Sequence, residues 1–250
     1  MSLQERFNHF VQTLKPISLP PKCLVLSDLH AAGGDDHDPL RASGTEAAIL
    51  DLLRQYFDKE YALLKNGDWW DTWRGETLTR IYSNHQALRN IVSEFASINR
   101  LYETLGNHER NLFNYPEALI FSGFGKKIFL DHGYFEDWPN DSGWEIGRFA
   151  VRAADKLGLD PETGKPYIPP TSPHPSNPDR HSEVRTMRAQ LAKDNPDYQI
   201  LYGHTHYAEC SVECEGFGKI DIPNYWNSGS PVTGTVTYYT IEEGNFTPHT

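Results

Sequence analysis

Five short apolar segments of this chain each end next to a residue that can bind a metal ion. Each segment is four or five residues long, the length of a short buried β-strand, and an Asp, Asn or His follows within a few residues. In an open α/β sheet, ligands bind outside the carboxyl ends of the strands. This limits the possible folds, because the carboxyl ends of all five strands, with the donor residues that follow them, must meet at one place. The segments are Cys23–Leu26, Tyr61–Leu64, Leu101–Leu105, Lys127–Leu130 and Tyr198–Tyr202.

The residues after these segments form a set of metal donors. Asp28 and His30 lie two positions apart after the first segment, so the alternation of a strand can direct both at one point. His204 and His206 repeat this arrangement after the last segment, and Asp68 and Asn107 each follow a glycine, which allows a tight turn. Imidazole mixed with carboxylate suits Mn²⁺, Fe, Zn²⁺ or Ni²⁺ better than Ca²⁺. The sequence therefore predicts a metal site, and seven donors favour two ions. They are Asp28, His30, Asp68, Asn107, His132, His204 and His206.

The length and the helical patterns favour one α/β domain spanning residues 1–250. Apolar residues at helical spacing predict helices over residues 4–14, Glu46–Tyr56 and Thr77–Ile98, the first of them on the outside of the sheet. Alternation of strands with helices favours a largely parallel arrangement. After His206 the chain is expected to continue as antiparallel strands over Ala208–Cys214, Lys219–Ile222, Tyr225–Asn227 and Thr235–Ile241.

Residues 134–198 differ from the rest of the chain. Gly143–Leu157 and Asp179–Lys193 have helical patterns, and the Pro-rich stretch Lys165–Pro175 between them excludes helix or central strand. We interpret this region as an insertion over the mouth of the site. A surface excursion unrelated to substrate is the alternative.

Charge and cysteine content limit the partners and the compartment. The formal net charge of −11 gives no strong nucleic-acid signal, because affinity for that backbone comes from Lys and Arg. Three cysteines do not form a disulfide framework, so a cytoplasmic protein is expected. The sequence contains no apolar run of the length that crosses a membrane. It does not indicate an oligomeric state.

These motifs together resemble the calcineurin-like metallophosphoesterase superfamily. The motif blocks are Asp28-x-His30, Gly67-Asp68-x-x-Asp71, Gly106-Asn107-His108-Glu109, His132-Gly133 and Gly203-His204-x-His206. The resemblance implies a sandwich of two mixed β-sheets flanked by helices. It also implies a binuclear, metal-dependent hydrolase of phosphate mono- or diesters on small substrates, acting through a metal-bridging hydroxide, with Mn²⁺ expected first.

The resemblance also assigns roles. It implies that Asp28, His30, Asp68 and His206 hold one metal, and that Asp68, Asn107, His132 and His204 hold the other. His108 corresponds to the family's general acid, which protonates the leaving group, and Asp71 to the carboxylate that pairs with it. Asp71 could instead be an ordinary helix N-cap, and Glu109 is expected to support the ligands.

Several interpretations stay open in the sequence. Arg110 and Arg74 are candidate phosphate contacts or plain surface salt-bridge partners. Trp69, Trp70 and Trp73 could stack on a substrate ring or pack between helix and sheet.

The substrate is also open. The motifs resemble the bacterial branch that includes UDP-2,3-diacylglucosamine pyrophosphohydrolases, but Tyr134 stands where those enzymes carry an acidic residue. A nucleotide-sugar or lipid pyrophosphohydrolase is therefore one alternative to a phosphate mono- or diesterase. A non-catalytic metal-binding scaffold is the other.

Overall fold

Two mixed β-sheets form the centre of the structure, as predicted. The computed structural model describes residues 1–34, 38–73, 77–110, 113–135, 145, 149 and 182–250. The five-stranded sheet has the order β12-β11-β2-β3-β4, in which β2, β3 and β4 are parallel. Its strands are β2 (Lys22–Leu26), β3 (Ala62–Asn66), β4 (Leu101–Thr104), β11 (Tyr238–Glu242) and β12 (Asn245–His249).

The seven-stranded sheet has the order β1-β5-β6-β7-β10-β8-β9. Strands β6 and β7 are parallel, and β10 continues in parallel beside β7. Its strands are β1 (Ile17–Ser18), β5 (Ala118–Gly123), β6 (Lys126–Asp131), β7 (Gln199–Tyr202), β8 (Glu209–Cys210), β9 (Gly218–Lys219) and β10 (Tyr225–Asn227).

An apolar core joins the inner faces of the sheets. Val25 and Leu64 from one sheet share a buried cluster with Ile128 and Leu201 from the other. Alternate residues of the same strands point outward, because successive side chains of a strand lie on opposite faces. Leu24 and Leu63 thus belong to a second cluster beneath the helices. The sandwich is therefore buried on both faces of its central strands.

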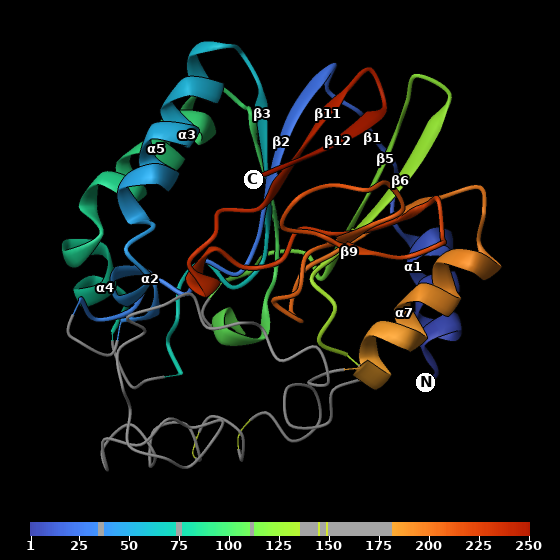
Figure 1. Cartoon of the computed structure of the whole chain (residues 1–250), viewed down its shortest axis with the longest axis horizontal. Helices are drawn as coiled ribbons and strands as arrows, with labels where there is room; N and C mark the ends of the chain where they lie inside the picture. The colour runs from blue at the N-terminus through green and yellow to red at the C-terminus, as the bar shows by residue number, and fades with distance from the viewer. Residues whose placement is uncertain (35–37, 74–76, 111–112, 136–144, 146–148, 150–181) are drawn as a thin grey trace.

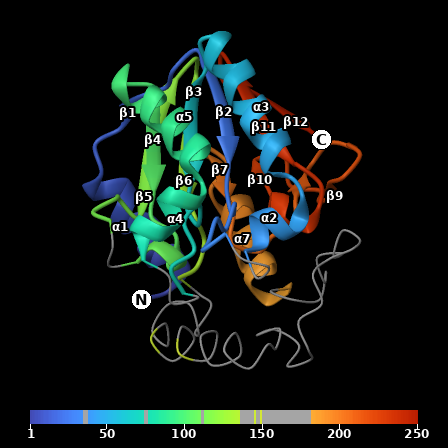
Figure 2. The same ribbon diagram turned by 90° about the vertical axis from the view of Figure 1, so that its left-hand side faces the viewer.

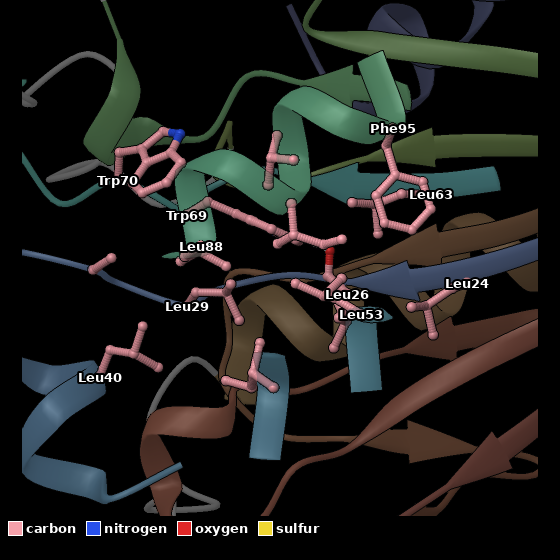
Figure 3. Packing of buried hydrophobic residues seen from close by; sticks show 14 of the residues in the cluster. Leu24, Leu26, Leu29, Leu40, Leu53, Leu63, Trp69, Trp70, Leu88 and Phe95 are labelled. Carbon is pink, nitrogen blue, oxygen red and sulfur yellow. Dashed lines mark hydrogen bonds between the residues drawn. The ribbon is translucent and has the colours of Figure 1, made fainter. Parts of the chain in front are cut away.

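Helices cover the two outer faces (Figure 1). Figure 2 shows α3, α4 and α5 in front of the five-stranded sheet, where Trp69, Leu88 and Phe95 form part of the buried cluster in Figure 3. Phe7 of α1 packs on Phe129 of the other sheet, so α1 lies outside the sheet, as expected. The helices are α1 (Leu3–Thr13), α2 (Pro39–Ser43), α3 (Glu46–Asp58), α4 (Leu78–Asn84), α5 (Gln86–Ser97) and α7 (Ser182–Asp194).

One sequence expectation needs correction and one is refined. The strands after His206 are not all antiparallel: β8 pairs with β9 in parallel, and β10 with β7. The helical region Thr77–Ile98 consists of two helices, and the ring of His85 between them binds Asp38 and Glu46. The loop after His30 contains the short helix α2, which Asp38 caps. Apart from residues 145 and 149, the expected helix at 143–157 lies outside the described residues, as does the Pro-rich stretch.

The carboxyl ends of five strands meet at one end of the sandwich. Leu26 of β2 is in register with Lys65 of β3, and Leu130 of β6 with Leu201 of β7. The loops that follow are tied together: the His30 N–H donates to the Asp68 carbonyl at 2.9 Å, and the His204 N–H donates to the Asp28 carboxylate at 3.1 Å. The last bond links the two sheets, so ligands from both can surround one centre.

Candidate metal centre

The proposed ligands adopt an uncommon backbone conformation. Five of them have positive φ angles, a region that non-glycine residues rarely occupy. Such a conformation costs about 1–3 kcal/mol per residue and persists only where the surrounding structure enforces it. The φ values are 56° at Asp28, 47° at His30, 54° at Asp68, 64° at His204 and 58° at His206.

Two glycines allow the ligand loops to approach each other. A Cβ atom on Gly106 would lie 2.1 Å from Oδ1 of Asp68, and one on Gly203 would lie 2.6 Å from Oδ2 of Asp28. No side chain fits at either position without moving a carboxylate. These glycines therefore let the loops after β4 and β7 pass directly against the carboxylates of the loops after β3 and β2.

The first cluster of donors consists of Asp28, His30 and His206, whose ligand atoms lie within 4.8 Å of one another. The Nε2 atoms of the two histidines are 2.9 Å apart, and Oδ1 of Asp28 lies 3.5 Å from Nε2 of His206. Two imidazole nitrogens this close must share a proton or a cation, since their lone pairs repel. The geometry suits one metal ion.

The second cluster consists of Asp68, His132 and His204. His132 is fully buried, and its Nδ1–H donates to the Asn66 carbonyl at 2.8 Å. Its Nε2 therefore points toward the carboxylates of Asp68, at 3.0 Å, and Asp28, at 3.8 Å. At that position Nε2 can carry a proton or bind a metal ion. A backbone carbonyl on the far nitrogen is the usual support of a metal-binding histidine. Asn107, which is buried, is joined to the cluster through its neighbour His108, whose N–H donates to Asp68 at 2.8 Å.

The charges of the centre also favour cations. Burial, reinforced by the charge of Asp68, raises the pKa of Asp28 to about 7, against the opposing charge of His132. Burial, together with the charge of His108, lowers the pKa of His30 to about 4. The second pair shifts the other way: against the effect of burial, the charges of Asp68 and Asp28 raise the pKa of His132 to about 10, and the charge of His132 lowers the pKa of Asp68 well below its usual range. Without a metal, the cation of the centre is therefore the His132 imidazolium. A bound divalent cation would favour the ionised carboxylate and the neutral imidazole.

A third group lies beside these clusters. The Nδ1 of His108 is 2.8 Å from Oδ1 of Asp71, and its side chain remains 17% exposed. His30 contacts the same ring edge-on, with 4.6 Å between centroids. The first described helix after Asp71 is capped by Thr77, so Asp71 pairs with His108 and is not the cap of α4.

A buried ion pair supports the loops after β3 and β4. The Nζ atom of Lys65 donates to Oε1 of Glu109 at 2.9 Å, and both side chains are completely buried. The same oxygen accepts from the N–H groups of Trp69 and Trp70 at 3.1 and 3.2 Å. A supporting role of Glu109 was predicted from the sequence, whereas that of Lys65 was not. A lysine inside an apolar strand was the available signal, because such a charge requires a partner.

The remaining candidates are placed less centrally. The guanidinium of Arg110 lies over the ring of Tyr134, 5.6 Å from its centroid, and Arg74 lies outside the described residues. Trp69, Trp70 and Trp73 are at most 4% exposed, so none of them offers an open face to a substrate ring. Trp69 and Trp70 belong to the helix–sheet cluster, whereas Trp73 lies against His108.

Comparison with known proteins identifies the family. The sequence model of the calcineurin-like phosphoesterases matches residues 21–208, which include every proposed ligand. The chain therefore belongs to the calcineurin-like phosphoesterase family. Among curated proteins, none matches this chain.

Within the described residues, no helix is both long and apolar enough to cross a bilayer.

Solved structures show distant likenesses. A conserved protein from Streptococcus pneumoniae TIGR4, titled a predicted phosphoesterase, is 14% identical with a TM-score of 0.35, covering 92% of this chain and 97% of its own. Vps29 from Cryptosporidium parvum is 14% identical with a TM-score of 0.37, covering 91% and 95%. A Vps29 variant from Entamoeba histolytica is 15% identical with a TM-score of 0.38, covering 91% and 97%. These scores carry no argument about substrate.

Proposed function

We propose that this protein hydrolyses phosphate esters of small substrates at a centre that holds two divalent cations. The observation that carries this proposal is a paired, partly exposed histidine beside two clusters of donors. The clusters suit two ions, one held by Asp28, His30, Asp68 and His206, the other by Asp68, Asn107, His132 and His204. When bound, such ions supply Lewis acidity and an activated water.

His108 is assigned the role of general acid. Its Nδ1–H donates to the Asp71 carboxylate, which leaves Nε2 as the nitrogen that exchanges a proton with the substrate. Among the described side chains of the centre, only His206, at 30%, is more exposed than His108, at 17%. Protonation of the leaving oxygen by a positioned imidazole contributes about 10²–10⁴-fold to such reactions.

The test compares p-nitrophenyl phosphate with bis-p-nitrophenyl phosphate after chelation and re-addition of Mn²⁺, Fe²⁺, Zn²⁺ or Ni²⁺. We expect turnover that depends on the added metal, two ions per chain, and loss of turnover in Asp68→Asn. His108→Ala should retain the metals and lose most activity. The preferred ester separates monoesterase from diesterase or pyrophosphatase chemistry. Turnover that survives chelation and both substitutions contradicts the proposal, and two bound metals without turnover of any phosphate ester favours the scaffold.

A further inference from the structure

Trp73 forms an unusual contact with the proposed general acid. Its indole stacks on the imidazole of His108 with 4.4 Å between ring centroids and 13° between the ring planes. The indole is only 4% exposed, and its Nε1–H donates to the Asn107 carbonyl at 2.9 Å. The same side chain therefore touches the ring of His108 and the backbone of its loop.

Three consecutive residues hold His108 in different ways. Oδ1 of Asp71 binds the Nδ1 edge at 2.8 Å, and the Thr72 hydroxyl donates to the His108 carbonyl at 2.6 Å. Trp73 covers one face of the ring, and its own N–H donates to Oδ1 of Asp71 at 2.9 Å. Each of the three contacts constrains a different motion of the histidine.

The stack restricts a motion that the carboxylate alone leaves free. A hydrogen bond at one edge fixes Nδ1 but still lets the ring tilt about that bond. A parallel aromatic ring opposes this tilt, because stacked rings lose contact when one of them turns. Tilting would move Nε2, the nitrogen that must reach the leaving oxygen within hydrogen-bond distance. Misplacement by about 1 Å can cost a large factor in rate.

We propose that Trp73 is a positioning residue that fixes the plane of the His108 imidazole for protonation of the leaving group. This inference rests on the proposed function, in which His108 is the general acid. Trp73 is not a member of the apolar cluster that contains Trp69 and Trp70, and its ring contacts His108 and the Asn107 carbonyl instead.

Leaving groups of different basicity test this role. p-Nitrophenolate departs readily without a proton, whereas phenolate depends more on the acid. We expect Trp73→Leu to lower kcat for phenyl phosphate about tenfold with KM nearly unchanged, and for p-nitrophenyl phosphate about twofold. Trp73→Phe keeps a stacking ring and should restore most of the rate. If the unsubstituted protein prefers diesters, the corresponding diphenyl and bis-p-nitrophenyl esters replace these probes.

Two controls separate positioning from packing. In a His108→Ala background, Trp73→Leu should have no further effect, because a residue that acts through His108 is not additive with it. Trp70→Leu removes a buried tryptophan of the same loop that contacts Tyr82 and not His108. It should lower stability without changing the ratio of the two kcat values. An NMR signal of the His108 ring, shifted upfield by the indole, should move downfield in Trp73→Leu.

The outcomes distinguish this inference from the proposed function. Equal losses on both esters, or full additivity with His108→Ala, overturns the role of Trp73 alone. Phosphatase activity that needs His108 but is unchanged in Trp73→Leu does the same. No turnover of any ester by the unsubstituted protein overturns the proposed function, and the role of Trp73 with it.

Discussion

Two buried histidines of this protein, His85 and His132, lie close to carboxylates, and they differ in the partners of their two ring nitrogens. His85 binds Oδ2 of Asp38 through Nε2 at 2.6 Å and Oε1 of Glu46 through Nδ1 at 2.7 Å. Both of its nitrogens thus have carboxylate partners, which suits an imidazolium. His132 instead binds a backbone carbonyl through Nδ1, and its Nε2 faces two carboxylates of the proposed metal centre.

The difference teaches how a structural histidine differs from a ligand. Burial alone would lower the pKa of His85, but the bonds and charges of Asp38 and Glu46 outweigh it and raise that pKa to about 9. The result is a closed ionic cluster that stabilises the loop after His30, since Asp38 also accepts from the Gly34 N–H at 2.8 Å. The charges of Asp68 and Asp28 also raise the pKa of His132, to about 10, so the two histidines do not differ in charge when no metal is present. They differ in geometry, because His132 has its far nitrogen on a backbone carbonyl and its near nitrogen directed at other donors, as a metal ligand requires.

The largest expected effect comes from removing the His132 imidazole. His132→Ala should lose one of the two proposed metals and lower turnover about a thousandfold or more, because the ion that His132 would hold acts directly on the reacting group. Metal analysis and steady-state kinetics measure the two losses. The matched variant His85→Ala should keep both metals. If both variants lose metal equally, the two histidines are not distinct.

The next largest effect comes from removing the His85 imidazole, and it concerns stability. His85→Ala leaves the Asp38 carboxylate buried without its cation, and we expect the free energy of unfolding to fall by about 3 kcal/mol. Denaturant unfolding at saturating Mn²⁺ measures the change. His132→Ala, compared after chelation of both proteins, should also lower stability, because without a metal the His132 imidazolium is the cation beside the buried Asp28 and Asp68 carboxylates. A destabilisation below about 1 kcal/mol in His85→Ala would show that the cluster is not a stabilising ion pair.

The strand-end motifs of the site could be predicted because each is local. An apolar run, a Gly or Ser and a donor are adjacent in the sequence, as in Gly67-Asp68 or Gly203-His204, and parallel strands bring them together without further information. The sandwich followed from the family resemblance of those motifs.

What the sequence could not predict depends on contacts between distant segments. Lys65 meets Glu109 across 44 residues, and His85 meets Asp38 across 47. Two-residue strands such as β8 and β9 have no periodicity that would indicate their direction. The stack of Trp73 on His108 is invisible for the same reason, because ring orientation depends on how two loops meet.

The smallest effect sharpens the comparison through pH. The pKa of His85 is raised from 6.5 to about 9 in the folded protein. Its contribution to stability is therefore complete below about pH 6.5 and is lost as the pH rises through about 9. We expect a decline of about 1 kcal/mol, less than the full shift implies, because Arg41 and solvent also act on Glu46, with Nε of Arg41 3.9 Å from Oε2 of Glu46.

His85→Gln removes the titrating group and should flatten this part of the profile. The difference between unsubstituted protein and His85→Gln isolates the cluster, because the metal centre titrates identically in both and cancels. Denaturant unfolding from pH 6 to pH 9.5 gives both curves. Parallel curves would mean that His85 does not carry its charge in the folded state. Converging curves would show that His85 is protonated in the folded protein and that its charge stabilises the cluster with Asp38 and Glu46.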